Sequence, residues 1–389
     1  MPQNIDVLIA GAGPSGISTA LHLIQKDKTW KDRVIVLDKA TFPRPKLCGG
    51  GLSLFAIDIL HQLGLDLDIP HVIINQLQLV FADNAYVVEE EAFLRITRRE
   101  IFDDWLLKNS IARGIEVHQN EEIIAIETNP TLQVITTTET YTPKVLVVAD
   151  GSNSFIKRKL NWQRGKVARL LEILTPANSS DHAFQSGVAT FDFTPMMRGL
   201  QGYYWDFPSL IQGRATMNRG IYDSRIHPKQ PRIPLQTEFK RQLARRGISL
   251  SEYPLSGHPI HLFDPAAEFS RPHILLVGDA AGADPLFGEG IPAALAYGEV
   301  AADEIIASWQ EKDLEFTKYK TRILHHPLLG QLRYRTLAAR ALYRLTRKPH
   351  LAKQLWKLTP VMFNILARTK PRYLPLRTPR MIRQTYHLD

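Results

Sequence analysis

The fold is decided by residues 5–38, which read IDVLIAGAGPSGISTALHLIQKDKTWKDRVIVLD. A β-branched run at residues 5–10 leads into a glycine-rich turn, a helical pattern follows at residues 15–25, and a second apolar run covers residues 33–38. A strand, a turn, a helix and a second strand in so short a stretch predict a βαβ unit with parallel strands.

The turn in this unit has the spacing G-x-G-x-x-G, with Gly11, Gly13 and Gly16 at the glycine positions. In such turns the first glycine permits a tight bend, the second lets the main chain approach a pyrophosphate, and the third lets the helix and strand pack closely. The helix N-terminus adds unpaired N–H groups for the phosphates. Asp38 follows Gly16 by 22 residues, the place of an acid that binds ribose hydroxyls. These features predict a Rossmann-type dinucleotide site.

Two later strands also end in short polar turns. The run VLVVA is followed by Asp150 and Gly151, and the run HILLV by Gly278 and Asp279. The two pairs resemble the DG and GD fingerprints of the FAD-dependent flavoprotein hydroxylase superfamily. In that superfamily the GD aspartate contacts the ribityl chain of FAD, and the DG motif supports the pyrophosphate. The resemblance covers most of residues 1–309 and implies FAD as the dinucleotide.

Three segments narrow this resemblance. They read FPRPKLCGGG at residues 42–51, GYYWDFP at residues 202–208 and GDAAGADPLFGEGI at residues 278–291. They look like the FPR-x-K-x-CGGG, Y-x-W-x-F-P and GDAAG…PL-x-GEGI segments of geranylgeranyl reductases, which saturate isoprenoid double bonds. The glycine pair expected after the second segment stands here as Asn218-Arg219-Gly220.

The resemblance also implies which residues contact or support FAD. Arg99 falls where the superfamily places an FAD-contacting arginine, and Ile123 matches an adenine-side main-chain position. A helix predicted at residues 291–309 would direct its first N–H groups at the negative charge of reduced flavin. The predicted cofactor-binding residues are Gly11, Gly13, Pro14, Ser15, Gly16, Asp38, Lys39, Lys46, Cys48, Gly49, Arg99, Ile123, Asp150, Gly151, Gly278, Asp279, Pro285, Gly288, Gly290 and Ile291.

The predicted catalytic residues are Cys48, Tyr203 and Trp205. Tyr203, Trp205 and Phe207 alternate along a strand and would form an aromatic wall suited to a polyprenyl chain. The alternative is an ordinary half-buried sheet face. Cys48, which is followed by glycines, would donate a proton or control hydride access, or else be a small buried hydrophobe. The sequence leaves the proton donor open.

We therefore expect an α/β protein: a Rossmann-type FAD-binding domain with an inserted antiparallel β-sheet substrate domain and a C-terminal helical basic segment. The alternating pattern at residues 187–221 is typical of an antiparallel sheet that floors a substrate site. The expected boundaries are residues 1–165 and 265–315 for the FAD-binding domain, 70–100 and 166–264 for the substrate domain, and 316–389 for the basic helical region.

The charge is divided unevenly along the chain. Residues 316–389 contain six Lys and eleven Arg but a single acid, Asp389, and carry a charge of +16. Because the formal net charge of the whole chain is +9, the first 315 residues carry −7. Basic amphipathic helices with an aromatic anchor such as Trp356 suit an anionic membrane surface. An acidic electron-donor protein would also suit them, and the plain alternative is a solvated helical cap. No motif supports nucleic-acid binding.

Composition limits the cellular locations that we expect for the protein. The 44% hydrophobic and 22% charged residues are those of an ordinary globular chain. No uncharged apolar run is long enough to cross a bilayer, and the first strand has no basic flank typical of a signal peptide. The single cysteine fits a reducing compartment and, with scattered histidines, predicts no metal site. We expect a cytoplasmic protein, peripheral to a membrane if the basic region binds lipid.

The leading hypothesis is an FAD-dependent oxidoreductase that reduces C=C bonds of an isoprenoid, geranylgeranyl-type substrate by hydride transfer from flavin N5. The alternative is an FAD-dependent monooxygenase or halogenase acting on an aromatic or terpenoid substrate, since YYWDFP is not far from the halogenase motif W-x-W-x-I-P. Hydroxylases, however, usually have His and Asn where this chain has Gly282 and Pro292. A carotenoid-type cyclase or desaturase and a catalytically silent flavin-binding protein also stay open. The identity of the reductant, either NADPH or a ferredoxin-like protein, also stays open.

Overall fold

The computed structural model describes residues 2–82, 84–163, 165–357 and 380–385. Its first sheet has the order β15 (Ser270–Arg271), β16 (Ile274–Leu276), β9 (Thr140–Val148), β1 (Gln3–Ala10), β2 (Val34–Asp38) and β6 (Glu116–Gln119). Strands β7 (Ile123–Glu127) and β8 (Gln133–Thr136) form a hairpin that joins it through β9. Strand β1 is parallel to both β2 and β9. The predicted parallel βαβ unit is confirmed.

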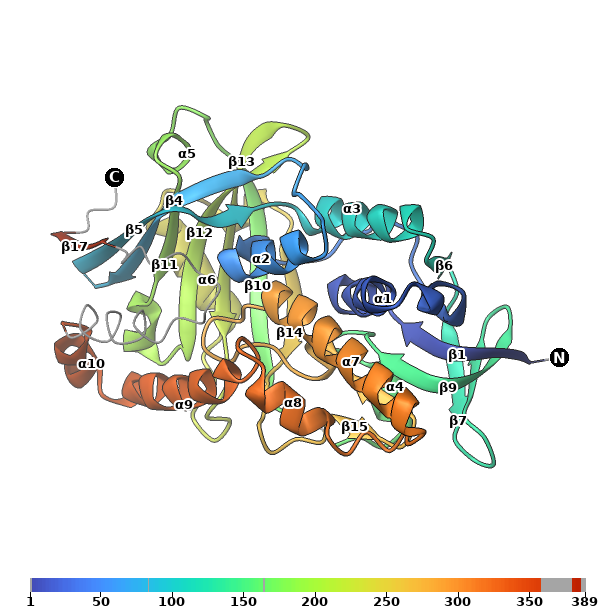
Figure 1. Ribbon diagram of the computed structural model, residues 1–389. Helices are drawn as coiled ribbons and strands as arrows, with labels where there is room; N and C mark the ends of the chain where they lie inside the picture. Colours follow the sequence, from blue (N-terminus) through green and yellow to red (C-terminus); the bar gives the residue numbers. More distant parts are fainter. Residues whose placement is uncertain (1, 83, 164, 358–379, 386–389) are drawn as a thin grey trace.

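The second sheet stands beside the first (Figure 1). Its order is β14 (Ser256–His261), β10 (Val167–Pro176), β13 (Arg214–Asp223), β12 (Gly202–Ile211), β11 (Val188–Asp192), β4 (Val72–Phe81), β5 (Asn84–Ile96) and β17 (Arg380–Thr385), with β3 (Gly51–Ser53) also paired to β5. The pair β11 and β4 is parallel and the other pairs are antiparallel. This mixed α/β architecture agrees with the expected fold class.

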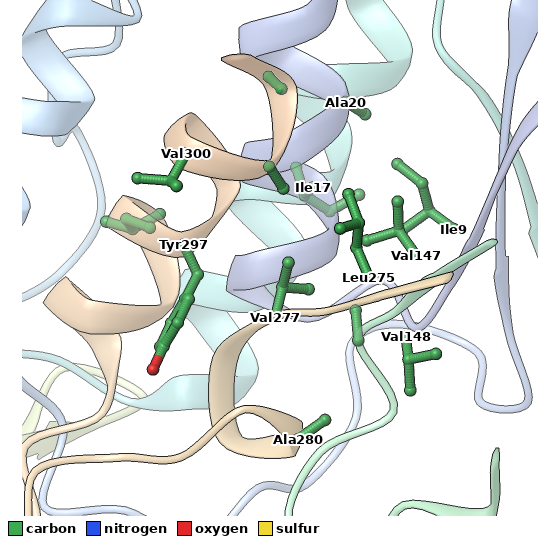
Figure 2. Packing of buried hydrophobic residues seen from close by; sticks show 14 of the residues in the cluster. Ile9, Ile17, Ala20, Val147, Val148, Leu275, Val277, Ala280, Tyr297 and Val300 are labelled. Carbon is green, nitrogen blue, oxygen red and sulfur yellow. The ribbon is translucent and has the colours of Figure 1, made fainter. Parts of the chain in front are cut away.

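Helices α1 (Pro14–Lys26) and α7 (Ile291–Glu311) pack together on the first sheet. Figure 2 shows Tyr297 and Val300 of α7 beside Ile17 and Ala20 of α1, with Ile9 and Val147 of the sheet next to α1. Their approach is close because Gly298 has no side chain: a Cβ there would lie 2.5 Å from Ser18 Oγ. Ser18 Oγ donates instead to the carbonyl of Leu295, at 2.7 Å. This packing fixes the first turns of both helices, which face the same region at the end of the sheet.

The remaining helices cover the two sheets (Figure 1). On the second sheet, Tyr204 points away from Tyr203 and Trp205 and packs against Phe239. Strand β12 is therefore buried on both faces rather than half-buried. The bounds are α2 (Leu54–Gln62), α3 (Arg99–Ala112), α4 (Phe155–Lys159), α5 (His182–Gln185), α6 (Leu235–Ala244), α8 (Tyr319–His325), α9 (Gln331–Arg344) and α10 (Pro349–Trp356).

The C-terminal region departs in part from the expected helical segment. Helices α8, α9 and α10 agree with it, but residues 380–385 form strand β17 at the edge of the second sheet. Residues 358–379 and 386–389 lie outside the described residues. Strand β3 also joins the second sheet from within the predicted FAD-binding segment. The division into domains therefore stays a prediction. Among the described helices, none is long and apolar enough to cross a membrane.

Candidate functional site

A cavity of about 1280 Å³ lies between the two sheets. One end is lined by residues that follow β1, β2, β9 and β16, among them Gly11, Asp150 and Asp279; the other end is lined by the face of the second sheet. Ligands of parallel α/β sheets bind at the carboxyl ends of the strands. Sites for a single drug-sized ligand usually measure about 300–1,000 Å³, so this cavity has room for a dinucleotide and a second molecule.

The glycine turn shows which part of the cavity suits a pyrophosphate. Gly11 has φ +118°, and a Cβ there would lie 2.4 Å from the carbonyl oxygen of Ala149. A Cβ on Gly16 would lie 1.9 Å from the carbonyl oxygen of Gly11. At Gly13 the nearest atom is Arg44 Nη2, at 3.6 Å. The chain's own packing therefore requires Gly11 and Gly16, whereas Gly13 leaves space that a phosphate can occupy.

The acid that ends β2 is held by this turn. Asp38 accepts hydrogen bonds from the main-chain N–H of Ala12, at 2.9 Å, and of Ala40, at 2.8 Å. It lines the cavity beside Lys39 and Ile123, so the predicted ribose and adenine positions share one end of it. Two main-chain donors fix the orientation of the carboxylate and leave its other lone pairs for ligand hydroxyls.

Two arginines share one buried carboxylate next to Gly13. Arg99 donates to both oxygens of Asp103, at 2.7 and 2.8 Å, and Arg44 Nη2 lies 3.4 Å from Asp103 Oδ2. Although burial opposes the charged form, Asp103 raises the pKa of the Arg99 guanidinium. Two cations and one anion leave a net positive charge at the cavity wall, which suits a pyrophosphate.

The DG and GD aspartates both reach the cavity. Asp150 Oδ2 accepts from the N–H of Ile156 at 3.1 Å, whereas its buried Oδ1 has no hydrogen-bond partner among the described residues. Burial raises the pKa of Asp150. Asp279 accepts from Ser152 Oγ at 2.9 Å. A buried carboxylate oxygen without a partner is costly in the chain alone, and a hydroxyl or N–H of a bound ligand can satisfy it. The residues present therefore fit FAD.

A lysine and a histidine form a buried pair near Asp279. Lys46 Nζ lies 2.8 Å from His258 Nε2. Burial lowers the pKa of Lys46 although Asp279 opposes the shift. Burial and then the charge of Lys46 lower the pKa of His258 to about 4. The imidazole is therefore neutral at physiological pH and accepts the hydrogen bond, which directs the lysine along the cavity wall.

Aromatic rings line the other end of the cavity. The ring centroid of Phe191 lies 5.0 Å from those of Tyr203 and Phe207 and 5.9 Å from that of Phe287. Trp205 and Phe207 follow along the same strand, with centroids 6.2 Å apart. The predicted side chains Tyr203, Trp205 and Phe207 do share one face, and all three line the cavity. This wall is suited to an extended apolar ligand.

Cys48 lies where the glycine segment meets this wall. A Cβ on the next residue, Gly49, would lie 3.0 Å from the ring of Phe207. Asn218 donates to the carbonyl oxygen of Cys48 at 3.1 Å and accepts from Trp205 Nε1 at 2.8 Å. The asparagine that replaces an expected glycine therefore joins the Cys48 segment to the aromatic wall. Gly220 is needed beside it, since a Cβ there would lie 2.0 Å from the Trp205 ring.

Phenol groups hold the loop before α7. Tyr203 donates to the carbonyl oxygen of Phe287, Tyr222 to that of Pro285 at 3.2 Å, and Tyr343 of α9 to that of Leu286 at 2.5 Å. Burial raises the pKa of all three phenols well above the usual value, so they stay protonated donors.

Arg335 of α9 forms ion pairs with the same loop. Its Nη1 lies 2.8 Å from Asp284 Oδ2 and 2.9 Å from Glu289 Oε2. The loop that carries Gly288 and Gly290 is thus fixed from the second sheet and from the C-terminal region together.

The structure brings most of the predicted site residues together. The catalytic candidates Cys48, Tyr203 and Trp205 and most of the cofactor candidates line the cavity. Gly16, Gly278 and Pro285 lie behind its wall and support it. Their roles toward ligands stay predictions. Cavity residues that the sequence did not single out include Phe191, His258, Gln331, Tyr334 and Ala338.

Comparison with known proteins agrees with this geometry. Residues 4–294 match the family described as FAD binding domain. A protein named menaquinone reductase from Mycobacterium tuberculosis is 28% identical over 325 residues, 77% of this chain and 76% of that protein. A protein named digeranylgeranylglycerophospholipid reductase 2 from Methanopyrus kandleri is 25% identical over 334 residues, 80% of this chain and 79% of that protein.

Solved structures share the fold. A geranylgeranyl bacteriochlorophyll reductase-like protein from Thermoplasma acidophilum has a TM-score of 0.71 at 19% identity, over 90% of this chain and 92% of that one. The halogenase PltM has a TM-score of 0.69 at 16% identity, over 93% of this chain and 81% of that one. At these identities the likeness shows the fold alone.

Proposed function

The chain belongs to the FAD binding domain family and is an FAD-dependent oxidoreductase, and we propose that it reduces carbon–carbon double bonds of an isoprenoid, geranylgeranyl-type substrate. The observation that carries the proposal is a single cavity whose glycine-turn end fits a dinucleotide and whose opposite end is an aromatic wall. The names of related proteins, digeranylgeranylglycerophospholipid reductase and menaquinone reductase, support a reductive reaction on compounds of this kind.

The chain's residues divide into those that hold the cofactor and those that face the substrate. Gly13, the cationic pair Arg44 and Arg99, and Asp38 would hold the phosphates and ribose of FAD. When bound, the cofactor supplies a hydride from flavin N5 to one carbon of the double bond. The aromatic wall excludes water and orients an apolar chain, which brings the double bond into a fixed position.

A proton must reach the second carbon of the double bond, and Cys48 is the best placed candidate of the three predicted catalytic residues. The O–H of Tyr203 is committed to the carbonyl of Phe287, and its pKa is raised by burial. The N–H of Trp205 is committed to Asn218. The Cys48 thiol is half-buried, lines the cavity, and has no hydrogen bond to another described residue. Its Sγ–H bond would break as the new C–H bond forms, with water restoring the proton.

The test is an anaerobic incubation of the FAD-loaded enzyme with dithionite and geranylgeranyl compounds, followed by mass spectrometry. We expect products that gain two hydrogens for each double bond reduced, and slower product formation by Cys48→Ala with an unchanged FAD content. Replacing dithionite with NADPH or a reduced ferredoxin identifies the physiological reductant.

A reduced flavin that persists beside every polyprenyl substrate would contradict the proposal. Oxygen uptake that depends on an aromatic or terpenoid substrate, with stoichiometric hydroxylated or halogenated product, would replace it with the monooxygenase or halogenase activity.

A further inference from the structure

The C-terminal helices carry an unusual set of exposed apolar side chains. Tyr334 and Leu337 of α9 are 58% and 59% exposed, the largest values among the exposed large hydrophobics of the described chain. Leu351 and Leu355 of α10 are 38% and 37% exposed. The two leucines of α10 are four residues apart and share one face of the helix. Isolated exposed hydrophobics are normal, but a group of four on two consecutive helices indicates an interaction surface.

Helix α9 has two apolar faces, and packing on the body of the protein accounts for one. Its inner face buries Leu332, Ala339 and Tyr343. Its outer face carries Tyr334, Leu337, Ala338 and Ala341, at the helical spacing i, i+3, i+4 and i+7. A helix that only caps the body would have a polar outer face. Among the described residues, the outer face of α9 is therefore a candidate surface for a partner.

The charge around these side chains defines that partner. The sequence has no Asp or Glu between Phe316 and Leu388. Exposed bases accompany the apolar side chains, namely Arg333, Arg344, Arg347 and Lys348. Trp356, which the sequence indicated as an interfacial anchor, is instead stacked on Phe81 with ring centroids 5.2 Å apart. Among the described residues of this region, Tyr334 is the large aromatic side chain that is exposed.

We propose that the outer faces of α9 and α10, with Tyr334, Leu337, Leu351 and Leu355 among exposed bases, form a docking surface for an anionic lipid bilayer. Apolar side chains flanked by bases bind such surfaces by burying the former and pairing the latter with anionic headgroups. The docking surface adjoins the cavity, because Tyr334 and Ala338 both lie on it and line the cavity. Figure 1 shows α9 and α10 together at one end of the molecule. Docking there places these two cavity-lining residues next to the lipid phase.

The test is flotation of the FAD-loaded protein with phosphatidylcholine vesicles that contain or lack phosphatidylglycerol. We expect binding to the anionic vesicles that weakens with salt. Leu337→Glu with Leu351→Glu should abolish it. The control pair Ile111→Glu with Ile124→Glu changes two hydrophobics that are 45% and 49% exposed elsewhere, and should bind as the unchanged protein does.

A second pair of variants tests the charge. Arg344→Gln with Arg347→Gln should weaken binding about 25-fold, since each base near an anionic surface contributes about a fivefold change. Lys229→Gln with Lys240→Gln removes the same charge from exposed positions outside the C-terminal region and should leave binding unchanged. Melting temperatures of all variants establish that they fold.

The proposal is overturned if anionic vesicles do not bind, or if the control variants lose binding equally. Binding that follows the charge variants but ignores the two glutamate substitutions also overturns it, because the exposed apolar side chains would then take no part in docking. Vesicle flotation requires no turnover, so its result is separate from the proposed reductase activity.

Discussion

Replacing Arg335 with methionine deletes the cation that Asp284 and Glu289 share. The Asp284 side chain is 1% exposed and depends on Arg335 for its ion pair, at 2.8 Å. Burial raises the pKa of Asp284 even though Arg335 opposes the shift. Methionine retains most of the apolar stem and none of the charge, so the variant isolates the electrostatic contribution of this contact.

The expected cost is large. Removing one partner of a buried ion pair destabilises a protein by about 3–5 kcal/mol, because the remaining charge is left in a low dielectric. Unfolding entropy of about 2.1 cal/mol/K per residue gives about 0.8 kcal/mol/K for the 389 residues. Arg335→Met should therefore melt about 4–6 °C below the unchanged protein if the chain unfolds as one unit.

The loss should also depend on pH. Burial already raises the pKa of Asp284 in the folded protein, and loss of Arg335 removes a charge that opposes this shift, so the pKa rises further. The folded variant therefore keeps its additional proton to a higher pH, and its stability falls more steeply as pH rises. The melting difference is then larger at pH 8 than at pH 5.5. Adding Asp284→Asn removes the charge, keeps an acceptor for the N–H of Leu286, and should restore most of the stability.

Thermal melting followed by flavin fluorescence measures both the stability and the retention of FAD. Arg344→Met, on the same helix but exposed, is the matched control and should change stability by less than about 0.5 kcal/mol. An Arg335→Met protein that melts within one degree of the unchanged protein at pH 8, or loses as much at pH 5.5, would refute the reasoning.

Three further predictions concern the cavity. Gly13→Ala should fold normally, since its Cβ would meet no atom closer than 3.6 Å. It should nevertheless weaken FAD binding by about tenfold or more in a fluorescence titration. Gly16→Ala, by contrast, should not fold. Burial raises the pKa of Glu172 to about 7, which is above its value in the unfolded chain. The free energy of unfolding should therefore fall by about 3 kcal/mol between pH 4.5 and 7. Glu172→Gln should flatten this pH dependence in denaturant titrations. Cys48→Ala should lower the single-turnover rate of double-bond reduction by about 10²–10⁴ and leave the FAD content unchanged; an unaltered rate would exclude the thiol as proton donor.

Local patterns predicted which residues gather at the glycine-turn end of the cavity, whereas the contacts of these residues with a cofactor stay predictions. The glycine turn begins directly after β1, Asp38 is the last residue of β2, and the two aspartates follow β9 and β16 within three residues. Because the carboxyl ends of parallel strands meet at one edge, position along the chain was enough to bring them together. Conversely, the residues that join the two halves come from distant segments: Asn218 bonds to Cys48 across 170 positions, and Lys46 pairs with His258 across 212. No local spacing marks such contacts.

The basic C-terminal region is a second case in which the local sequence did not predict the contacts. Its excess of charge indicated a partner, but composition could not distinguish Arg335, which is directed inward at Asp284, from its exposed neighbours. Nor did the sequence predict β17, because six residues without a strongly alternating pattern become a strand here by pairing with β5. In both cases tertiary contacts decide what the local sequence leaves open.

The inward side of α9 also determines how its outward side can be tested. Tyr343 and Arg335 hold the loop next to the cavity, and Ala339 lies in the core of the second sheet. Deleting the chain from Phe316 would therefore remove part of the cavity wall and expose a buried carboxylate. Such a protein would lose vesicle binding for reasons unrelated to lipid. Single substitutions at Leu337 and Leu351 change only outward side chains. If the outer face binds a bilayer while the inner face holds the loop before α7, one helix connects the lipid surface to that loop of the cavity wall. A variant with intact melting behaviour can then separate the two roles.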